Sequence, residues 1–329
     1  MKAPFPYFGG KSQVAVEVWL ALGQPDHYLE PFFGSGAVLL ARPDWTPDMT
    51  ETVCDKDGFI ANAWRGIQFA PEEVAKWCDW PVNHCCLNAR RRRLNEAAGL
   101  AAKLSADDMF FDAKLAGYWI WAASCWIGSG LTRPGAMPHL AGKGKGVHAI
   151  GQMPHLADKG KGIHAIGQRP HLADKGKGVR QTTMGIYAWF AQLSHRLRRV
   201  RVVCGDWTRI CGGDWQTHHW LNAGIFFDPP YSVADRDSQI YSEESLTVAQ
   251  DVATWCLARG QRGDHRIVLA GYADEHPRLV EAGWTMIAWK TGGGYGNTAG
   301  KKVTRGQENR HREMLYCSPH CHRESTLFA

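Results

Sequence analysis

An acid, two prolines and an aromatic ring follow one another at Asp228, Pro229, Pro230 and Tyr231. The Asp228 carboxylate and a backbone carbonyl of the rigid Pro-Pro unit are both acceptors, and together they can hold the two hydrogens of a planar exocyclic amino group. Tyr231 can stack on the attached ring. Such a nitrogen presents its lone pair for attack, so catalysis would come mostly from positioning and electrostatics. The tetrapeptide alone is equally typical of a polar turn that closes a strand.

The elements around this tetrapeptide place the acid. Residues 225–227 have the composition of a short buried strand, and the strand must end before Pro229, because proline cannot donate to a sheet ladder. We therefore expect Asp228 at the carboxyl end of a strand, where open α/β sheets bind their ligands.

A second segment, residues 28–40, predicts a short strand, a turn with Gly34 and Gly36, and the start of a helix. Paired glycines let a backbone approach a ligand closely, although the third glycine of a dinucleotide fingerprint is missing. The next apolar segment ends in Asp55, about twenty residues on, where an acid often binds a ribose. An ordinary helix cap at Asp55 or Asp57 is an equal alternative.

The order of four blocks, residues 7–11, residues 30–36, Asp55 and residues 228–231, resembles that of the Dam-type (D12-class) DNA adenine N6-methyltransferases. The resemblance covers nearly the whole chain. It implies an α/β, Rossmann-like S-adenosylmethionine-dependent methyltransferase fold with a mixed, mostly parallel sheet and a mainly helical target-recognition insert. Residues 1–60 and 182–329 would form the catalytic domain. Residues 61–181 would form the insert, with a repeat loop at 137–180.

The resemblance also implies roles for individual residues. Lys11 would meet the cofactor carboxylate, Asp55 the ribose hydroxyls, and Asp228 both the sulfonium charge and the target amine. Asp206 matches the acid beside the cofactor adenine, and a surface turn is an equal alternative. The cofactor-binding set is Tyr7, Gly9, Gly10, Lys11, Glu30, Pro31, Phe32, Gly34, Gly36, Asp55, Asp206 and Asp228, and the catalytic set is Asp228, Pro229, Pro230 and Tyr231. No metal is implied. Residues 308–316 resemble the closing strand of the family and are expected to be structural.

The implied reaction is site-specific methyl transfer from S-adenosylmethionine to the N6 amine of an adenine in double-stranded DNA. The adenine must first leave the helix, because a base inside a duplex cannot reach such a pocket. Cytosine N4 is the alternative target, since the tetrapeptide suits either amine. A catalytically weak DNA-binding protein with the same fold is a second alternative, and RNA as the substrate is a weaker third.

Composition agrees with this interpretation. The chain has 329 residues, 44% of them hydrophobic, which suffices for one α/β core and an inserted subdomain. Its formal charge of +6 has the sign that a polyanion binder needs. The ten irregularly spaced cysteines and the lack of a signal peptide predict a cytoplasmic protein, of a bacterium or a phage-infected host, with reduced thiols. The apolar stretch 119–127 is too short to cross a bilayer. Cys317, His320, Cys321 and His322 lack the second ligand pair that zinc sites usually need.

Two arginine-rich runs, residues 90–93 and 195–201, could contact phosphates or form solvated faces. The clearest internal repeat lies at 137–180, with a period of about sixteen residues and too little apolar surface for an independent solenoid. It is expected to be a basic loop, in which Lys143, Lys145, Lys159, Lys161, Lys175 and Lys177 meet phosphates; a tolerated surface insertion is the alternative. It lacks the pattern of a nucleotide P-loop.

Residues 119–133, just before the repeats, resemble the helix and Gly-Leu-x-Arg turn that open the DNA-reading hairpin of the family. By this match Arg133 is a candidate base reader, because a guanidinium can bond two acceptors of a guanine. The aromatic residue and asparagine that usually precede the glycine are here Gly128 and Ser129. The GATC target of the family is therefore not implied.

Deletion of residues 137–180 tests the role of the repeats. We expect weaker DNA binding or a changed site preference in a filter-binding or methylation assay, with unchanged cofactor affinity by calorimetry. Unchanged DNA affinity and site preference would contradict the hypothesis that the repeats extend the recognition hairpin.

Overall fold

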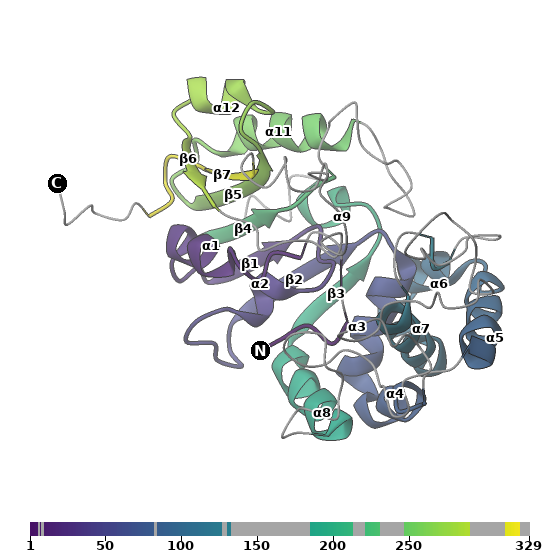
Figure 1. Ribbon diagram of the computed structural model, residues 1–329. Coiled ribbons are helices and arrows are strands. Elements are labelled where there is room, and N and C mark those ends of the chain that lie inside the picture. The colour runs from purple at the N-terminus through teal and green to yellow at the C-terminus, as the bar shows by residue number, and fades with distance from the viewer. Residues whose placement is uncertain are drawn as a thin grey trace, which may run out of the picture.

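The computed structural model describes residues 1–5, 7, 10–81, 84–126, 130–132, 185–212, 221–230, 247–289 and 313–322. In this part of the chain, a seven-stranded sheet runs through the molecule (Figure 1). Its strands are β1 (His27–Glu30), β2 (Thr50–Asp55), β3 (Val200–Cys204), β4 (Ala223–Phe227), β5 (His265–Tyr272), β6 (Thr285–Ala288) and β7 (Glu313–Cys317). Their order across the sheet is β3-β2-β1-β4-β5-β7-β6.

Five neighbouring strands, β3 to β5, are parallel, whereas β7 is antiparallel to both β5 and β6. From β1 the chain proceeds to β2 and β3 on one side, and β4 and β5 follow on the other. The order therefore reverses between β1 and β4, which is the topological switch point where α/β sheets bind ligands. The predicted α/β class with a mixed, mostly parallel sheet is confirmed.

Helices lie on both faces of the sheet and in a separate group beside it. They are α1 (Ala15–Leu22), α2 (Ala37–Leu40), α3 (Gly58–Phe69), α4 (Pro71–Cys78), α5 (His84–Asn95), α6 (Leu100–Ala106), α7 (Ala113–Cys125), α8 (Ile186–Leu197), α9 (Thr208–Cys211), α11 (Val248–Arg259) and α12 (Pro277–Glu281). No helix among the described residues is long and apolar enough to cross a membrane.

Side chains alternate between the two faces along the central strands, as the strand period of two requires. Phe226 of β4 packs with α1, α3 and α8 on one face. Ile225 and Phe227 pack with α9, α11 and α12 on the other. Both faces of β4 are therefore covered, which explains why residues 225–227 form a continuous apolar run.

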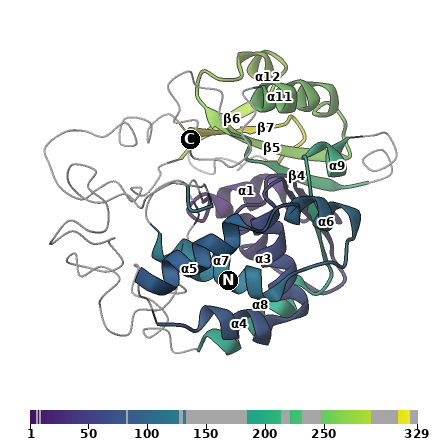
Figure 2. The ribbon, with the colours of Figure 1, turned by 90° about the vertical axis from the view of Figure 1, so that its right-hand side faces the viewer.

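Helices α4, α5 and α7 form a group at the β3 end of the sheet (Figures 1 and 2). Helix α3 connects this group to the sheet, because it contacts β2 and β3 as well as α4 and α7. Residue 61, the expected start of a target-recognition insert, lies inside α3. The division into a catalytic domain and an insert stays a prediction.

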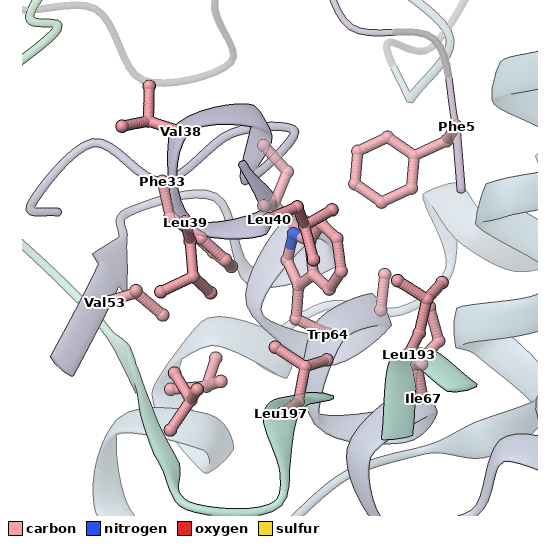
Figure 3. Close-up of a cluster of buried hydrophobic side chains, with 14 of the residues drawn as sticks. Phe5, Phe33, Val38, Leu39, Leu40, Val53, Trp64, Ile67, Leu193 and Leu197 are labelled. Atoms are coloured by element: carbon pink, nitrogen blue, oxygen red, sulfur yellow. The ribbon is translucent and has the colours of Figure 1, made fainter. Parts of the chain in front are cut away.

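The core under the β1 turn is centred on Trp64, a fully buried residue of α3 (Figure 3). Its ring centroid lies 5.0 Å from that of Phe33 and 5.5 Å from that of Phe5. Its indole Nε1 donates to the carbonyl of Gly34 at 2.9 Å. The packing of α3 therefore fixes the turn that follows β1.

A buried carboxylate with two guanidinium partners holds the amino end of β2. Glu51 accepts from Arg42 at 3.0 Å and from Arg196 at 2.5 and 2.9 Å. Arg42 also donates to the carbonyl of Pro25, and Arg196 to that of Leu39. The cluster joins β2 to the segment after α2 and to α8. Helices α3 to α7 separate α8 from the other two in the sequence.

We expect Glu51→Gln to lower the free energy of unfolding by about 3–5 kcal/mol, because it leaves two buried guanidinium groups without a counter-charge. Asp48→Asn is the matched control, since Asp48 pairs with Arg199 at 3.4 Å on the surface, and it should cost less than about 1 kcal/mol. Urea unfolding followed by tryptophan fluorescence measures both. Equal losses in the two variants would contradict the prediction.

Candidate functional site

A pocket opens at the switch point, beyond the carboxyl ends of β1, β2, β3 and β4. Its volume is about 140 Å³, roughly ten times the space that one water requires, so it can admit an organic ligand. The predicted site residues that line it are Tyr7, Gly10, Lys11, Glu30, Pro31, Phe32, Gly34, Asp55, Asp206, Asp228 and Pro230.

Residues from five separate parts of the sequence thus meet in one pocket. Gly36 and Pro229 belong to its turns without lining it. Gly9, Tyr231, Arg133, Lys143, Lys145, Lys159, Lys161, Lys175 and Lys177 lie outside the described residues. The contributions of Phe33, Ser35, Ala37, Val38, Lys56, Asp57, Gly205, Trp207, Phe226 and Val248 to the lining were not predicted.

The turn after β1 requires both of its glycines. Gly34 and Gly36 have φ values of 47° and 62°, in the left-handed region that other residues rarely adopt. A Cβ atom at Gly34 would lie 2.6 Å from the Tyr7 ring, and one at Gly36 would lie 2.7 Å from the Phe33 ring. The turn therefore keeps its backbone in close contact with Tyr7 at the pocket wall.

Asp55 receives two backbone donors at the end of β2. Its Oδ2 accepts from the N–H of Gly34 at 2.8 Å, and its Oδ1 from that of Asp57 at 2.9 Å. Burial raises the pKa of Asp55 to about 7, and the charge of Asp57 acts in the same direction, against the two donors. Asp57 caps α3 by accepting from Phe59 at 2.8 Å. The helix-cap interpretation is therefore confirmed for Asp57, and both Asp55 and Asp57 line the pocket.

Glu30 bonds groups of the protein itself. Its Oε2 accepts from the Tyr28 hydroxyl at 2.9 Å and from the N–H of Leu39 at 3.2 Å. Burial raises the pKa of Glu30 well above its ordinary value, against the effect of these two donors. Glu30 thereby anchors α2 to β1 while it lines the pocket floor, so its role includes positioning the turn.

Lys11 and Asp228 form an ion pair, with Nζ and Oδ1 separated by 2.8 Å. The lysine side chain is 6% exposed and the aspartate 22%, and both residues line the pocket. Lys11 was predicted to meet the carboxylate of a ligand. In this structure it bonds the carboxylate that follows β4, and thereby fixes its position.

Glu313 is a further acid at this edge, which the sequence analysis treated as part of a structural strand. Because β7 is antiparallel, its first residue pairs with Tyr272 at the carboxyl end of β5. Desolvation and the charge of Asp228 raise the pKa of Glu313, and Lys11 lowers it. No local pattern signals Glu313, since only the strand direction brings it to the site.

Aromatic rings form the opposite wall. Phe32 and Trp207 both line the pocket, and each packs on Phe227, with centroid distances of 6.4 and 6.0 Å. Asp206 accepts from the hydroxyl and the N–H of Thr208 at 2.7 and 3.1 Å, so it forms a turn and also lines the pocket. This wall suits a flat ring with polar edges.

Among the described residues, no group of three or more His, Cys, Asp or Glu side chains could hold a metal ion. The ten cysteines are all free thiols. No protein-family model matches the sequence, and a search of curated proteins gives no match.

The raised pKa of Asp55 predicts a specific dependence of stability on pH. An unfolded aspartate titrates near 3.8 and the folded one at about 7, so between these values the folded state binds more protons and stability falls as pH rises. Asp55→Asn should remove the part of this pH-dependent loss of stability that comes from Asp55. Urea unfolding of both proteins between pH 4 and 8 measures it, and parallel curves would contradict the assignment.

Proposed function

We propose that this protein is a site-specific DNA methyltransferase that transfers a methyl group from S-adenosylmethionine to the exocyclic N6 of a flipped adenine. The observation that carries the proposal is the position of Asp228, which lies at the switch point, paired with Lys11 and opposite the glycine turn. The resemblance of the four sequence blocks to Dam-type enzymes supplies the choice of reaction.

The residues of the pocket fit S-adenosylmethionine by their chemistry. Asp55 and Asp206 offer acceptors for hydroxyl and amino groups, and Phe32 and Trp207 offer flat apolar surface for an adenine ring. Lys11 offers a positive charge for a carboxylate. A side chain at Gly34 would collide with the Tyr7 ring, so the glycine lets Tyr7 lie against the turn at the pocket wall. When bound, S-adenosylmethionine would supply a methyl group activated by the positive sulfonium.

Asp228 would accept a hydrogen bond from the target amine, together with a backbone carbonyl of the Pro229–Pro230 unit. Lys11 holds Oδ1 of Asp228, so the carboxylate is oriented before the amine arrives, and this preorganisation is what electrostatic catalysis requires. Glu313 lies close enough to Lys11 and Asp228 for their charges to act on its pKa, so it belongs to the electrostatic surroundings of this ion pair.

Double-stranded DNA is the proposed partner, and the cytoplasm the proposed location. The formal charge of +6 supports a polyanionic substrate. The alternatives are cytosine N4 as the target and a DNA-binding protein without activity. The identity of the labelled product distinguishes adenine N6 methylation, cytosine N4 methylation and DNA binding without activity.

The test incubates the purified protein with mixed-sequence duplex DNA and S-adenosylmethionine carrying an isotopically labelled methyl group, followed by mass spectrometry of the nucleosides. Labelled N6-methyladenine is expected. Labelled N4-methylcytosine would keep the mechanism and change the base, and unlabelled DNA despite bound cofactor would contradict an enzymatic role.

Asp228→Asn should lower the methylation rate at least about a hundredfold, because it replaces an acceptor with a donor and removes the partner of Lys11. Asp251→Asn is the matched control, since Asp251 is an exposed residue of α11. Equal activity of the two variants would overturn the role of Asp228.

A further inference from the structure

Three helices begin at the edge of the sheet where the pocket lies. Helices α2, α3 and α9 follow β1, β2 and β3 in the chain, so their first turns face the carboxyl ends of these strands. In nucleotide-binding α/β folds, the backbone N–H groups at such helix starts bind phosphate. The groups that bond these N–H donors therefore indicate whether the pocket can accept a phosphate.

Carboxyl groups of the protein bond a donor in each of the three first turns. Glu30 accepts from a backbone N–H of α2 at 3.2 Å, Asp57 from one of α3 at 2.8 Å, and Asp206 from one of α9 at 3.1 Å. All three acids also line the pocket. Helices α2 and α9 have only four residues each, so few peptide dipoles add up in them. A phosphate at any of these turns would meet a carboxyl group of the protein.

The glycine turn after β1 uses its donors in the same way. The N–H of Gly34 donates to Asp55 at 2.8 Å, and that of Gly36 donates to the carbonyl of Phe33 at 2.8 Å. In dinucleotide-binding turns, the glycines instead let the backbone approach the pyrophosphate. A carboxyl group accepts a hydrogen bond in its ionised and in its protonated form, so the raised pKa values of Glu30 and Asp55 leave these bonds in place.

The charges of the pocket lining also oppose a phosphate. Acids outnumber bases among the described lining residues, which include Glu30, Asp55, Asp57, Asp206 and Asp228 against Lys11 and Lys56. The buried Lys11 is already paired with Asp228 at 2.8 Å, and Lys56 is exposed. Helix α11, whose first residue lines the pocket, carries the acid Asp251 in its first turn. A polyphosphate would therefore enter a site that is rich in like charge.

We infer that Glu30, Asp57 and Asp206 are specificity-determining residues, which make the pocket accept an unphosphorylated nucleoside derivative and reject nucleoside phosphates. This inference rests on the proposed function and deepens it. S-adenosylmethionine meets the requirement, because its sulfonium and ammonium groups outweigh its single carboxylate. The phosphates of ADP carry only negative charge. The protein would thus bind its cofactor in the presence of an excess of cellular nucleotides.

Calorimetric titration of the full chain with S-adenosylmethionine, adenosine, AMP and ADP measures this selectivity. Magnesium is omitted, because it would neutralise the phosphates. We expect the wild type to bind adenosine at least about thirtyfold more tightly than ADP, with AMP between them, because each phosphate adds repulsion. S-adenosylmethionine should bind at least as tightly as adenosine.

A double variant, Asp57→Asn with Asp206→Asn, tests the origin of the selectivity. Asparagine also bonds the N–H groups of a helix start, so the variant keeps the caps while it removes two charges. The affinity ratio between adenosine and ADP should fall at least about fivefold. Asp206→Asn alone should give a smaller fall, and melting temperatures check that each variant is folded. Asp48→Asn is the control, because it removes a charge from the surface, and it should keep the wild-type ratio.

Equal affinities of the wild type for adenosine and ADP would overturn the inference without the need for any variant. An unchanged ratio in the folded double variant would overturn the role of the capping acids. A wild type that selects adenosine over ADP but does not methylate DNA would support the inference on the ligand class and contradict the proposed function. A wild type that methylates DNA but binds ADP as tightly as adenosine would overturn only the inference.

Discussion

The backbone N–H and C=O groups of Gly34 make the two hydrogen bonds on which the site depends. Its N–H donates to Asp55 at the end of β2, and its carbonyl accepts from the buried indole of Trp64 in α3. One left-handed residue thus joins the turn after β1, the neighbouring strand and the helical layer. The end of β3 is attached in the same way, because the N–H of Gly205 donates to the carbonyl of Asp55. The pocket is therefore preorganised by backbone groups and a core side chain.

Strand β2 carries acids near both ends, and their surroundings differ. Glu51 lies between two guanidinium groups, which compensate the cost of its burial. Asp55 accepts from backbone N–H groups and lies near the like charge of Asp57, so its negative charge is held by dipoles. The first arrangement stabilises the fold, whereas the second leaves a carboxyl group whose pKa is raised to about 7. The same strand therefore combines an ion-paired end with an end that lines the pocket.

Local patterns in the sequence predicted much of this arrangement. The apolar run before Asp228 and the glycine turn gave the strand ends, because proline and left-handed glycine restrict the backbone wherever they occur. The Lys11–Asp228 ion pair, the approach of Glu313 and the burial of Arg90 were not predicted. Each depends on contacts between segments far apart in the sequence or on the direction of a strand. The types of neighbouring residues do not indicate such contacts or directions.

The place of the helical group has a mechanical consequence. It enters the chain between β2 and β3, and β3 is the outermost strand on its side of the sheet. The group is nevertheless coupled to the pocket, because the Phe5 ring packs on both Trp119 of α7 and Trp64 of α3, and Trp64 bonds the glycine turn. A shift of α7 would therefore be transmitted through two aromatic rings to the pocket wall.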